Sequence, residues 1–91
     1  MKIWAKVMRG DKILRDVVYE GEHKLTASGF RDAVQNVAYL IDISTPVLLP
    51  AHLKHFASFN RVKFSPADFI EEVDFTCVVL EAVREDKPVK R

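Results

Sequence analysis

The sequence is short of the residues on which several classes of site depend. Its single cysteine, Cys77, excludes an internal disulfide framework and a paired-cysteine metal knuckle. Three glycines are too few for a glycine-rich loop that cradles phosphate groups. The longest stretch without Asp, Glu, Lys or Arg, residues 43–53, is about half the length of a membrane-spanning helix and contains two prolines. These absences argue against disulfide-stabilised, nucleotide-binding and membrane-spanning proteins.

Charge is almost balanced, and the pattern of a secretory signal is missing. Lys and Arg total 14, Asp and Glu total 13, and the net charge is +1. Lys6 and Arg9 interrupt the apolar residues near the start, where a signal would need a continuous apolar segment. A composition of 48% hydrophobic and 30% charged residues is typical of one compact soluble domain. We expect a cytoplasmic domain over residues 1–84 and a charged, frayed tail over 85–91.

Two alternating stretches, residues 2–9 and 12–19, predict a β-hairpin. Gly10 and Asp11 lie between them and favour a two-residue turn of type II′, in which glycine adopts a positive φ. A regular register from that turn puts Val7 opposite Leu14 and Ile3 opposite Val18. The predicted core face then contains Ile3, Ala5, Val7, Leu14 and Val18. The predicted opposite face contains Lys2, Trp4, Lys6, Met8, Ile13, Arg15, Val17 and Tyr19.

Two helices should follow the hairpin. Thr26 is suited to the N-cap of the first, and Pro46 is expected to end it. Its apolar positions recur at helical spacing: Phe30, Ala33, Val34, Val37, Ala38 and Ile41. Pro50 favours the start of a second helix over residues 50–59, and Asn60 is suited to a left-handed end. The apolar stripe predicted for that helix contains Leu49, Leu53, Phe56 and Phe59.

The remaining segments complete an α+β domain. Residues 61–64 alternate as a short strand, and Ser65 to Asp68 has the capping pattern that begins a brief third helix. Residues 75–83 are apolar on both strand faces, which predicts a central strand. The expected order is β-β-α-α-β-α-β, with a small, mostly antiparallel sheet built from the N-terminal hairpin and two C-terminal strands.

One predicted hairpin face combines aromatic rings with basic side chains. Trp4 lies between Lys2 and Lys6 on this face, and Arg15 and Tyr19 lie across from the two lysines. Rings that stack on bases and cations that neutralise phosphates make up single-stranded nucleic-acid platforms. The glycine–aromatic pattern of such platforms is missing, however, and the pI of about 7.9 is low for them. Nucleic-acid binding through this face is therefore an alternative function.

Two histidines raise a second alternative, a metal site. His52 and His55 are three residues apart on the predicted second helix, a spacing at which two ligands can share a metal. A closed site needs more ligands, which would come from the acidic residues of the 68–74 segment, with Glu71 and Glu72 as the candidates. The favoured interpretation is that the histidines border the apolar stripe of an amphipathic helix, so we expect no metal or other cofactor.

Catalytic motifs are missing, so we expect a protein that is not an enzyme. There is no G-x-S-x-G elbow, and Cys77 lies in an apolar strand, where an inert buried thiol is expected. The leading hypothesis is a protein–protein interaction or regulatory module. It would form a homodimer or pair with a partner at a sheet edge such as the short strand 61–64. Trp4, Met8 and Tyr19 are the predicted anchors of that contact.

Several short motifs in the chain resemble those of one bacterial family. They are Lys2-Ile-Trp-Ala-Lys6, Ser44-Thr-Pro-Val-x-Leu49, His55-Phe56, Phe64-x-x-x-Asp68-Phe-Ile-Glu71 and Asp74-Phe75. The pattern is similar to that of small proteins of about this length from Firmicutes-type bacteria, a family of unknown function. The resemblance covers most of the chain and implies a free-standing bacterial cytosolic domain. It implies no particular activity, ligand or catalytic residue.

Overall fold

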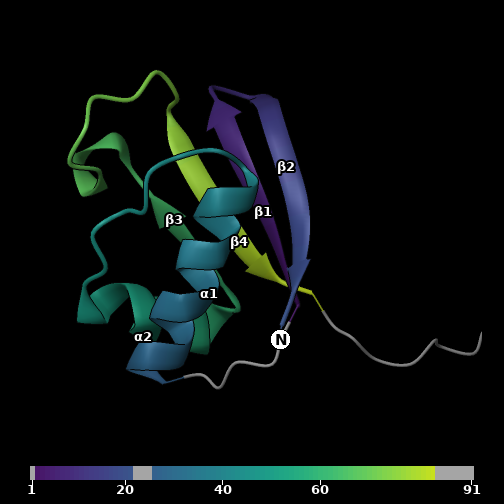
Figure 1. Ribbon diagram of the computed structural model, residues 1–91, viewed down its shortest axis with the longest axis vertical. Coiled ribbons are helices and arrows are strands. Elements are labelled where there is room, and N and C mark those ends of the chain that lie inside the picture. Colours follow the sequence, from purple (N-terminus) through teal and green to yellow (C-terminus); the bar gives the residue numbers. More distant parts are fainter. Residues whose placement is uncertain (1, 22–25, 84–91) are drawn as a thin grey trace, which may run out of the picture.

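The structure is a two-layer α+β domain in which helices cover one face of a four-stranded sheet (Figure 1). It is a computed structural model and describes residues 2–21 and 26–83. Along the chain the elements are β1 (Lys2–Arg9), β2 (Lys12–Glu20), α1 (Ala27–Leu40), α2 (Pro50–Phe59), β3 (Arg61–Phe64), the 3₁₀ turn η1 (Pro66–Asp68) and β4 (Cys77–Ala82). The predicted fold class and element order are confirmed. Within the described ranges, no helix has the length and apolarity needed to cross a membrane.

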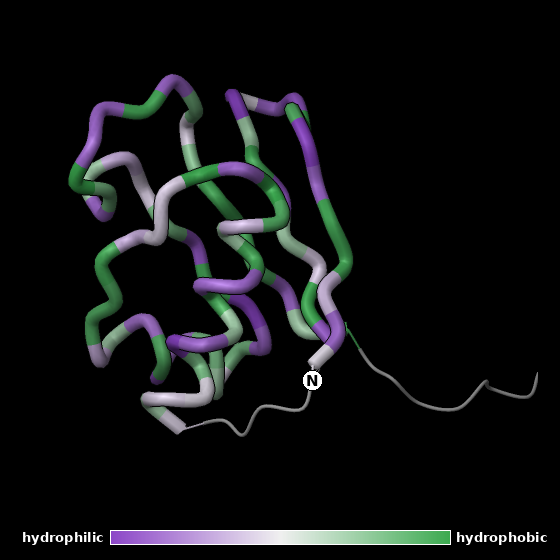
Figure 2. The backbone as a smooth tube through the Cα atoms, viewed as in Figure 1, coloured by the Kyte–Doolittle hydropathy of each residue, from purple (hydrophilic) through white to green (hydrophobic). Residues whose placement is uncertain are grey.

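The sheet is antiparallel throughout, with the strand order β2-β1-β4-β3. The predicted hairpin is present, and Gly10 has a φ of +61°, the conformation that a II′ turn requires at its first central residue. Strand β4 is central, as predicted from its apolar residues on both faces, and β2 and β3 form the two edges. Figure 2 shows hydrophobic residues concentrated along β4, whereas β1 and β2 contain both hydrophobic and hydrophilic residues.

The predicted hairpin register is wrong beyond the turn because β2 contains a β-bulge. The pairing shifts between Val7 and Met8, so that Val7 lies opposite Arg15 and not opposite Leu14. A bulge adds one residue to one strand, and every later side chain of that strand then changes face. Val18 therefore lies on the open face of the sheet, whereas Val17 packs against the core.

Helix α1 begins and ends through local hydrogen bonds. The Thr26 hydroxyl accepts a hydrogen bond from the Gly29 amide at 3.2 Å, which confirms the predicted N-cap. The helix ends before Pro46, because Asp42 adopts a left-handed φ of 60° and the Ile43 amide donates to the Ala38 carbonyl at 3.0 Å. This is a Schellman motif. All six residues of the predicted apolar stripe are buried.

Helix α2 has the predicted bounds but buries less of its predicted stripe. Asn60 ends it with a left-handed φ of 60°, as expected. Phe56 is buried and its ring centroid lies 5.3 Å from that of Phe30 in α1. Leu49 and Phe59 are exposed, because this ten-residue helix packs through its middle while both ends extend past the core.

The core lies between the sheet and the helices. From the sheet it takes Ile3, Ala5, Val7, Val62, Phe64, Val78 and Leu80, all of which point to the helix side. Phe69 and Phe75 close one end of it, with ring centroids 5.2 Å apart in an edge-on arrangement. Strand β4 is shorter than the predicted 75–83, since Phe75 is a buried residue of the preceding loop. Beyond Val83, the predicted frayed tail lies outside the described residues.

Candidate interaction surfaces

The predicted interaction residues divide between the two faces of the sheet. Lys2, Trp4, Lys6 and Met8 alternate with buried residues of β1 and lie on the face away from the helices. Arg15 and Tyr19 lie on the helix-covered face, which corrects the predicted six-residue surface. The reason is the bulge in β2, which reverses the faces of the residues that follow it. The Tyr19 hydroxyl accepts a hydrogen bond from Asn36 of α1 at 3.1 Å.

Trp4 lies at the centre of a network on the open face. Its indole Nε1 donates to Oδ2 of Asp16 at 2.8 Å, from the neighbouring strand β2. The Nζ atom of Lys6 lies 4.1 Å from the centre of the indole ring, a cation–π contact. The same Nζ makes an ion pair of 3.1 Å with Glu81 of β4. The indole N–H and the Lys6 charge are therefore already engaged within the molecule.

Charges on the open face are close to balanced. Its basic residues are Lys2, Lys6, Arg61 and Lys63, and its acidic residues are Asp16, Glu20 and Glu81. The register places Lys2 opposite Glu20, Lys6 opposite Asp16 and Arg61 opposite Glu81, so each acid lies beside a base. A platform for a phosphate backbone needs an excess of unpaired cations. The arrangement therefore gives little support to the nucleic-acid alternative.

Addition of a single-stranded oligonucleotide should leave the fluorescence of Trp4 unchanged. This tryptophan is the only one in the sequence, so it reports directly on the open face. A base that stacked on the indole would displace Lys6 and quench the emission. The measurement is a titration at low salt with mixed-sequence DNA and RNA. Salt-dependent quenching that the Lys6→Gln variant reduces would contradict the prediction and restore the nucleic-acid alternative.

The two histidines of α2 have separate structural partners. His52 Nδ1 accepts a hydrogen bond from the Leu49 amide at 2.9 Å, so in the neutral ring the proton is on Nε2. That Nε2 lies 3.6 Å from Oδ2 of Asp68. His55 Nδ1 lies 3.0 Å from the Arg61 carbonyl oxygen, which can only accept, so this nitrogen carries the proton. His52 thus offers no free lone pair, and the two rings do not converge.

Glu71 and Glu72 are not the groups that the histidines contact. His52 faces Asp68, which also caps η1 by accepting a hydrogen bond from the Ser65 amide at 2.8 Å. Among residues 2–21 and 26–83, no group of three or more His, Cys, Asp or Glu side chains is arranged to hold a metal ion. The four residues of the predicted metal site are therefore not brought together.

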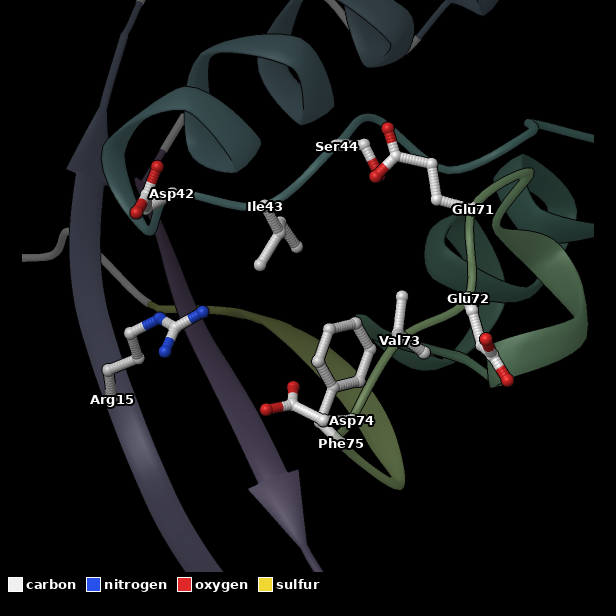
Figure 3. A pocket seen from close by; sticks show the side chains of 9 residues that line it. All are labelled: Arg15, Asp42, Ile43, Ser44, Glu71, Glu72, Val73, Asp74 and Phe75. Atoms are coloured by element: carbon white, nitrogen blue, oxygen red, sulfur yellow. The ribbon is translucent and has the colours of Figure 1, made fainter.

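Glu71 and Glu72 instead line a shallow hollow with a volume of about 690 Å³ (Figure 3). Asp42 and Asp74 add two more carboxylates to its wall. Arg15 is the only basic residue of the lining, and its Nε donates to the Ile41 carbonyl at 2.8 Å. A cation is stabilising at the C-terminal end of a helix, where the last carbonyls lack partners. Arg15, expected to serve an interaction surface, therefore serves to hold the end of α1 against β2.

The outer edge of β2 is a candidate interaction surface that the sequence analysis does not single out. The Lys2 carbonyl accepts from Val83 at 2.9 Å and the Met8 carbonyl accepts from Thr76 at 2.7 Å, so even-numbered residues of β1 bond toward β4. Successive residues of an antiparallel strand bond to opposite neighbours, which means that Ile3, Ala5 and Val7 bond toward β2.

The consequence is a row of backbone groups that point away from the sheet. The β2 partners of the odd-numbered β1 residues are Arg15, Val17 and Tyr19. The residues between and after them, Asp16, Val18 and Glu20, therefore direct their N–H and C=O groups outward. In the described part of the chain, no helix or strand lies along this edge (Figure 1).

Cys77 is half-buried on the open face opposite Met8, not fully buried as expected.

Comparison with known proteins gives no match. No protein-family model, no curated protein and no solved structure matches the chain.

Proposed function

We propose that the protein is a protein–protein interaction module that binds a strand of a partner polypeptide at the outer edge of β2 and acts without catalysis. The outward-facing backbone of Asp16, Val18 and Glu20 carries this proposal. Edge strands with free backbone groups are the templates for strand addition, in which backbone hydrogen bonds supply affinity and alternate side chains supply specificity. Val18 is 54% exposed at the middle of this edge, which gives a partner strand an aliphatic contact.

The side chains along this edge favour a particular kind of partner. On the inner side, β1 places Lys6, Trp4 and Lys2 opposite Asp16, Val18 and Glu20, a basic–apolar–basic pattern at alternate positions. An antiparallel partner strand with the same basic–apolar–basic pattern would place its basic residues beside Asp16 and Glu20 and its apolar residue beside Val18. Opposite charges across strands attract, so this pairing is favourable. A second copy of β2 paired about Val18 would instead bring Asp16 against Glu20. The edge therefore favours a foreign strand in that register.

A designed strand peptide tests this proposal. We expect the acetylated and amidated peptide Thr-Thr-Lys-Thr-Val-Thr-Lys-Thr-Thr to bind with a Kd on the order of 100 µM. Binding should change the emission of Trp4, which is the cross-strand neighbour of Val18. It should also shift the backbone amide resonances of residues 16, 18 and 20. The analogue with glutamate in place of both lysines should bind at least about tenfold more weakly.

Two substitutions at one position separate strand addition from other modes of binding. Val18→Pro removes the outward N–H without removing a bond to β1, so binding should fall at least about tenfold. The matched control Val18→Ala keeps that N–H and should lose only a few-fold. Unchanged binding to Val18→Pro, or equal binding of the lysine and glutamate peptides, would refute the proposal.

A further inference from the structure

An apolar groove lies where the first turns of α1 and α2 meet, on the opposite side of the molecule from the β2 edge. It has a volume of about 330 Å³. Its apolar lining is Phe30, Leu48, Leu49, Pro50 and Leu53. Two exposed basic residues, Arg31 and Lys54, complete the wall. The described residues that line the groove include no acid, so a basic rim surrounds an apolar floor.

Both helices begin at this groove, which makes its surroundings more positive. Ala27 opens α1, Pro50 opens α2, and both residues belong to the lining. Neither helix has an acidic residue in its first turn. The unpaired amides of a helix N-terminus carry partial positive charge, which here adds to the charges of Arg31 and Lys54. An occupant that joins an aliphatic side chain to carboxylates would match the groove.

The chain itself displays such a segment after η1. Ile70 is 87% exposed, the largest exposed fraction among the large hydrophobic residues in the described part of the chain. Glu71 and Glu72 follow it, and both are exposed. This acidic loop therefore carries an apolar anchor beside two carboxylates, the complement of the groove.

The groove and the acidic loop lie on one side of the molecule. The Val47 amide donates to the Asp68 carbonyl at 2.7 Å, which ties the segment that enters the groove to the start of the acidic loop. Helix α2 and the loop after β3 both lie on the side away from β2 (Figure 1). Val47, which makes the hydrogen bond to Asp68, is itself an exposed aliphatic residue.

We propose that two copies of the chain form a dimer in which each seats its Ile70 in the groove of the other. Glu71 and Glu72 of one copy then face Arg31 and Lys54 of its partner. Such a contact is isologous: a two-fold axis pairs the groove of each copy with the loop of the other and closes the assembly at two subunits. This interface goes beyond the proposed strand addition and leaves both β2 edges free. The dimer would therefore present two strand-binding edges.

Charge reversal in complementary variants tests this interface. One variant carries Arg31→Glu and Lys54→Glu, and the other carries Glu71→Lys and Glu72→Lys. All four positions are exposed, so each variant should fold. In each variant alone, groove and loop have the same sign, and dimerisation measured by sedimentation velocity should weaken at least about tenfold. An equimolar mixture places opposite charges at both contacts and should restore a dimer.

The apolar anchor is tested by a matched pair of substitutions. Ile70→Ser should abolish the dimer, whereas Tyr39→Ser, at a residue that is 84% exposed on α1, should leave it unchanged. A wild-type protein that stays monomeric up to about 1 mM would overturn the proposal, as would a mixture of the charge-reversed variants that remains monomeric. Val18→Pro should not alter the mass of the dimer. Failure of this interface is thereby distinguishable from failure of strand binding, which the peptide titration measures separately.

Discussion

Replacing Phe64 with alanine should lower the free energy of unfolding by about 3–5 kcal/mol, the usual cost of removing a fully buried phenylalanine ring. Phe64 has no exposed surface and lies opposite Val78 in the centre of the core. The centroid of its ring lies 4.6 Å from that of the His52 imidazole in α2. The cavity would therefore separate β3 from α2. Urea unfolding followed by circular dichroism measures the loss.

Phe59 supplies a matched control for this substitution. It is 65% exposed and lies at the end of α2, five residues before Phe64. Because little apolar surface is lost from the interior, Phe59→Ala should change the free energy of unfolding by no more than about 1 kcal/mol. Equal losses for the two variants would mean that the packing of β3 against α2 is not as described.

Replacing His52 with alanine should lower the free energy of unfolding by roughly 2 kcal/mol. The same change at His55 should lower it much less. His52 accepts the hydrogen bond of the Leu49 amide, which otherwise has no partner at the start of α2. His52 is at position N3 and accepts from the N-cap amide, and loss of one such hydrogen bond typically costs about 1 kcal/mol. The half-buried ring also packs on Phe64, and its loss removes a comparable amount of apolar burial.

His55→Ala is the matched control, since His55 is exposed and lies one turn along the same helix. Its ring contacts the exposed Phe59 and the Arg61 carbonyl, so the expected loss is no more than about 0.5 kcal/mol. Thermal unfolding with and without Zn²⁺ measures both variants and also addresses the metal hypothesis. A metal-dependent rise in Tm that both substitutions abolish equally would show that the histidines act as a ligand pair.

Most of the fold could be predicted because its signals are local. The Gly10 turn, the Thr26 cap, the Asn60 stop and the Ser65–Asp68 cap each depend on residues within about one turn of chain. The apolar stripe of α1 and the two-sided β4 depend on periodicity, which burial imposes directly. These features determined the class, the order of the elements and the central place of β4.

The predictions that failed depended on single residues whose effect is set by tertiary packing. A bulge near Leu14 has no glycine or other sequence signal, yet it moved Arg15 and Tyr19 from the open face to the helix side. The sequence predicts that α1 ends at Pro46, but the helix ends earlier, where Asp42 adopts a left-handed conformation that aspartate accepts at moderate cost.

The candidate sites were harder to predict because they join residues that are distant in sequence. The β2 edge depends on strand order, which periodicity does not determine. The groove depends on how α1 and α2 meet, and Ile70 was expected in a short helix, not on an exposed loop. The two histidines are close in sequence, but each contacts different groups. His52 contacts Leu49 and Asp68, and His55 contacts Arg61, so the histidines do not act as a pair.

The position of β4 between β1 and β3 also constrains the kinetics of folding. The hairpin β1–β2 can form locally, but β1 obtains its second neighbour only from residues about 75 positions later in the chain. To pair β4 with β1, the chain must close a long loop, and it loses conformational entropy before the new contacts compensate for that loss. The sheet should therefore assemble slowly for a domain of this size. Until β4 docks, β1 is an edge strand: the backbone groups of its even-numbered residues lack partners, and its apolar residues Ile3, Ala5 and Val7 lie beside that open edge. A nascent or truncated chain that lacks residues 77–82 would therefore expose the strand that most favours aggregation.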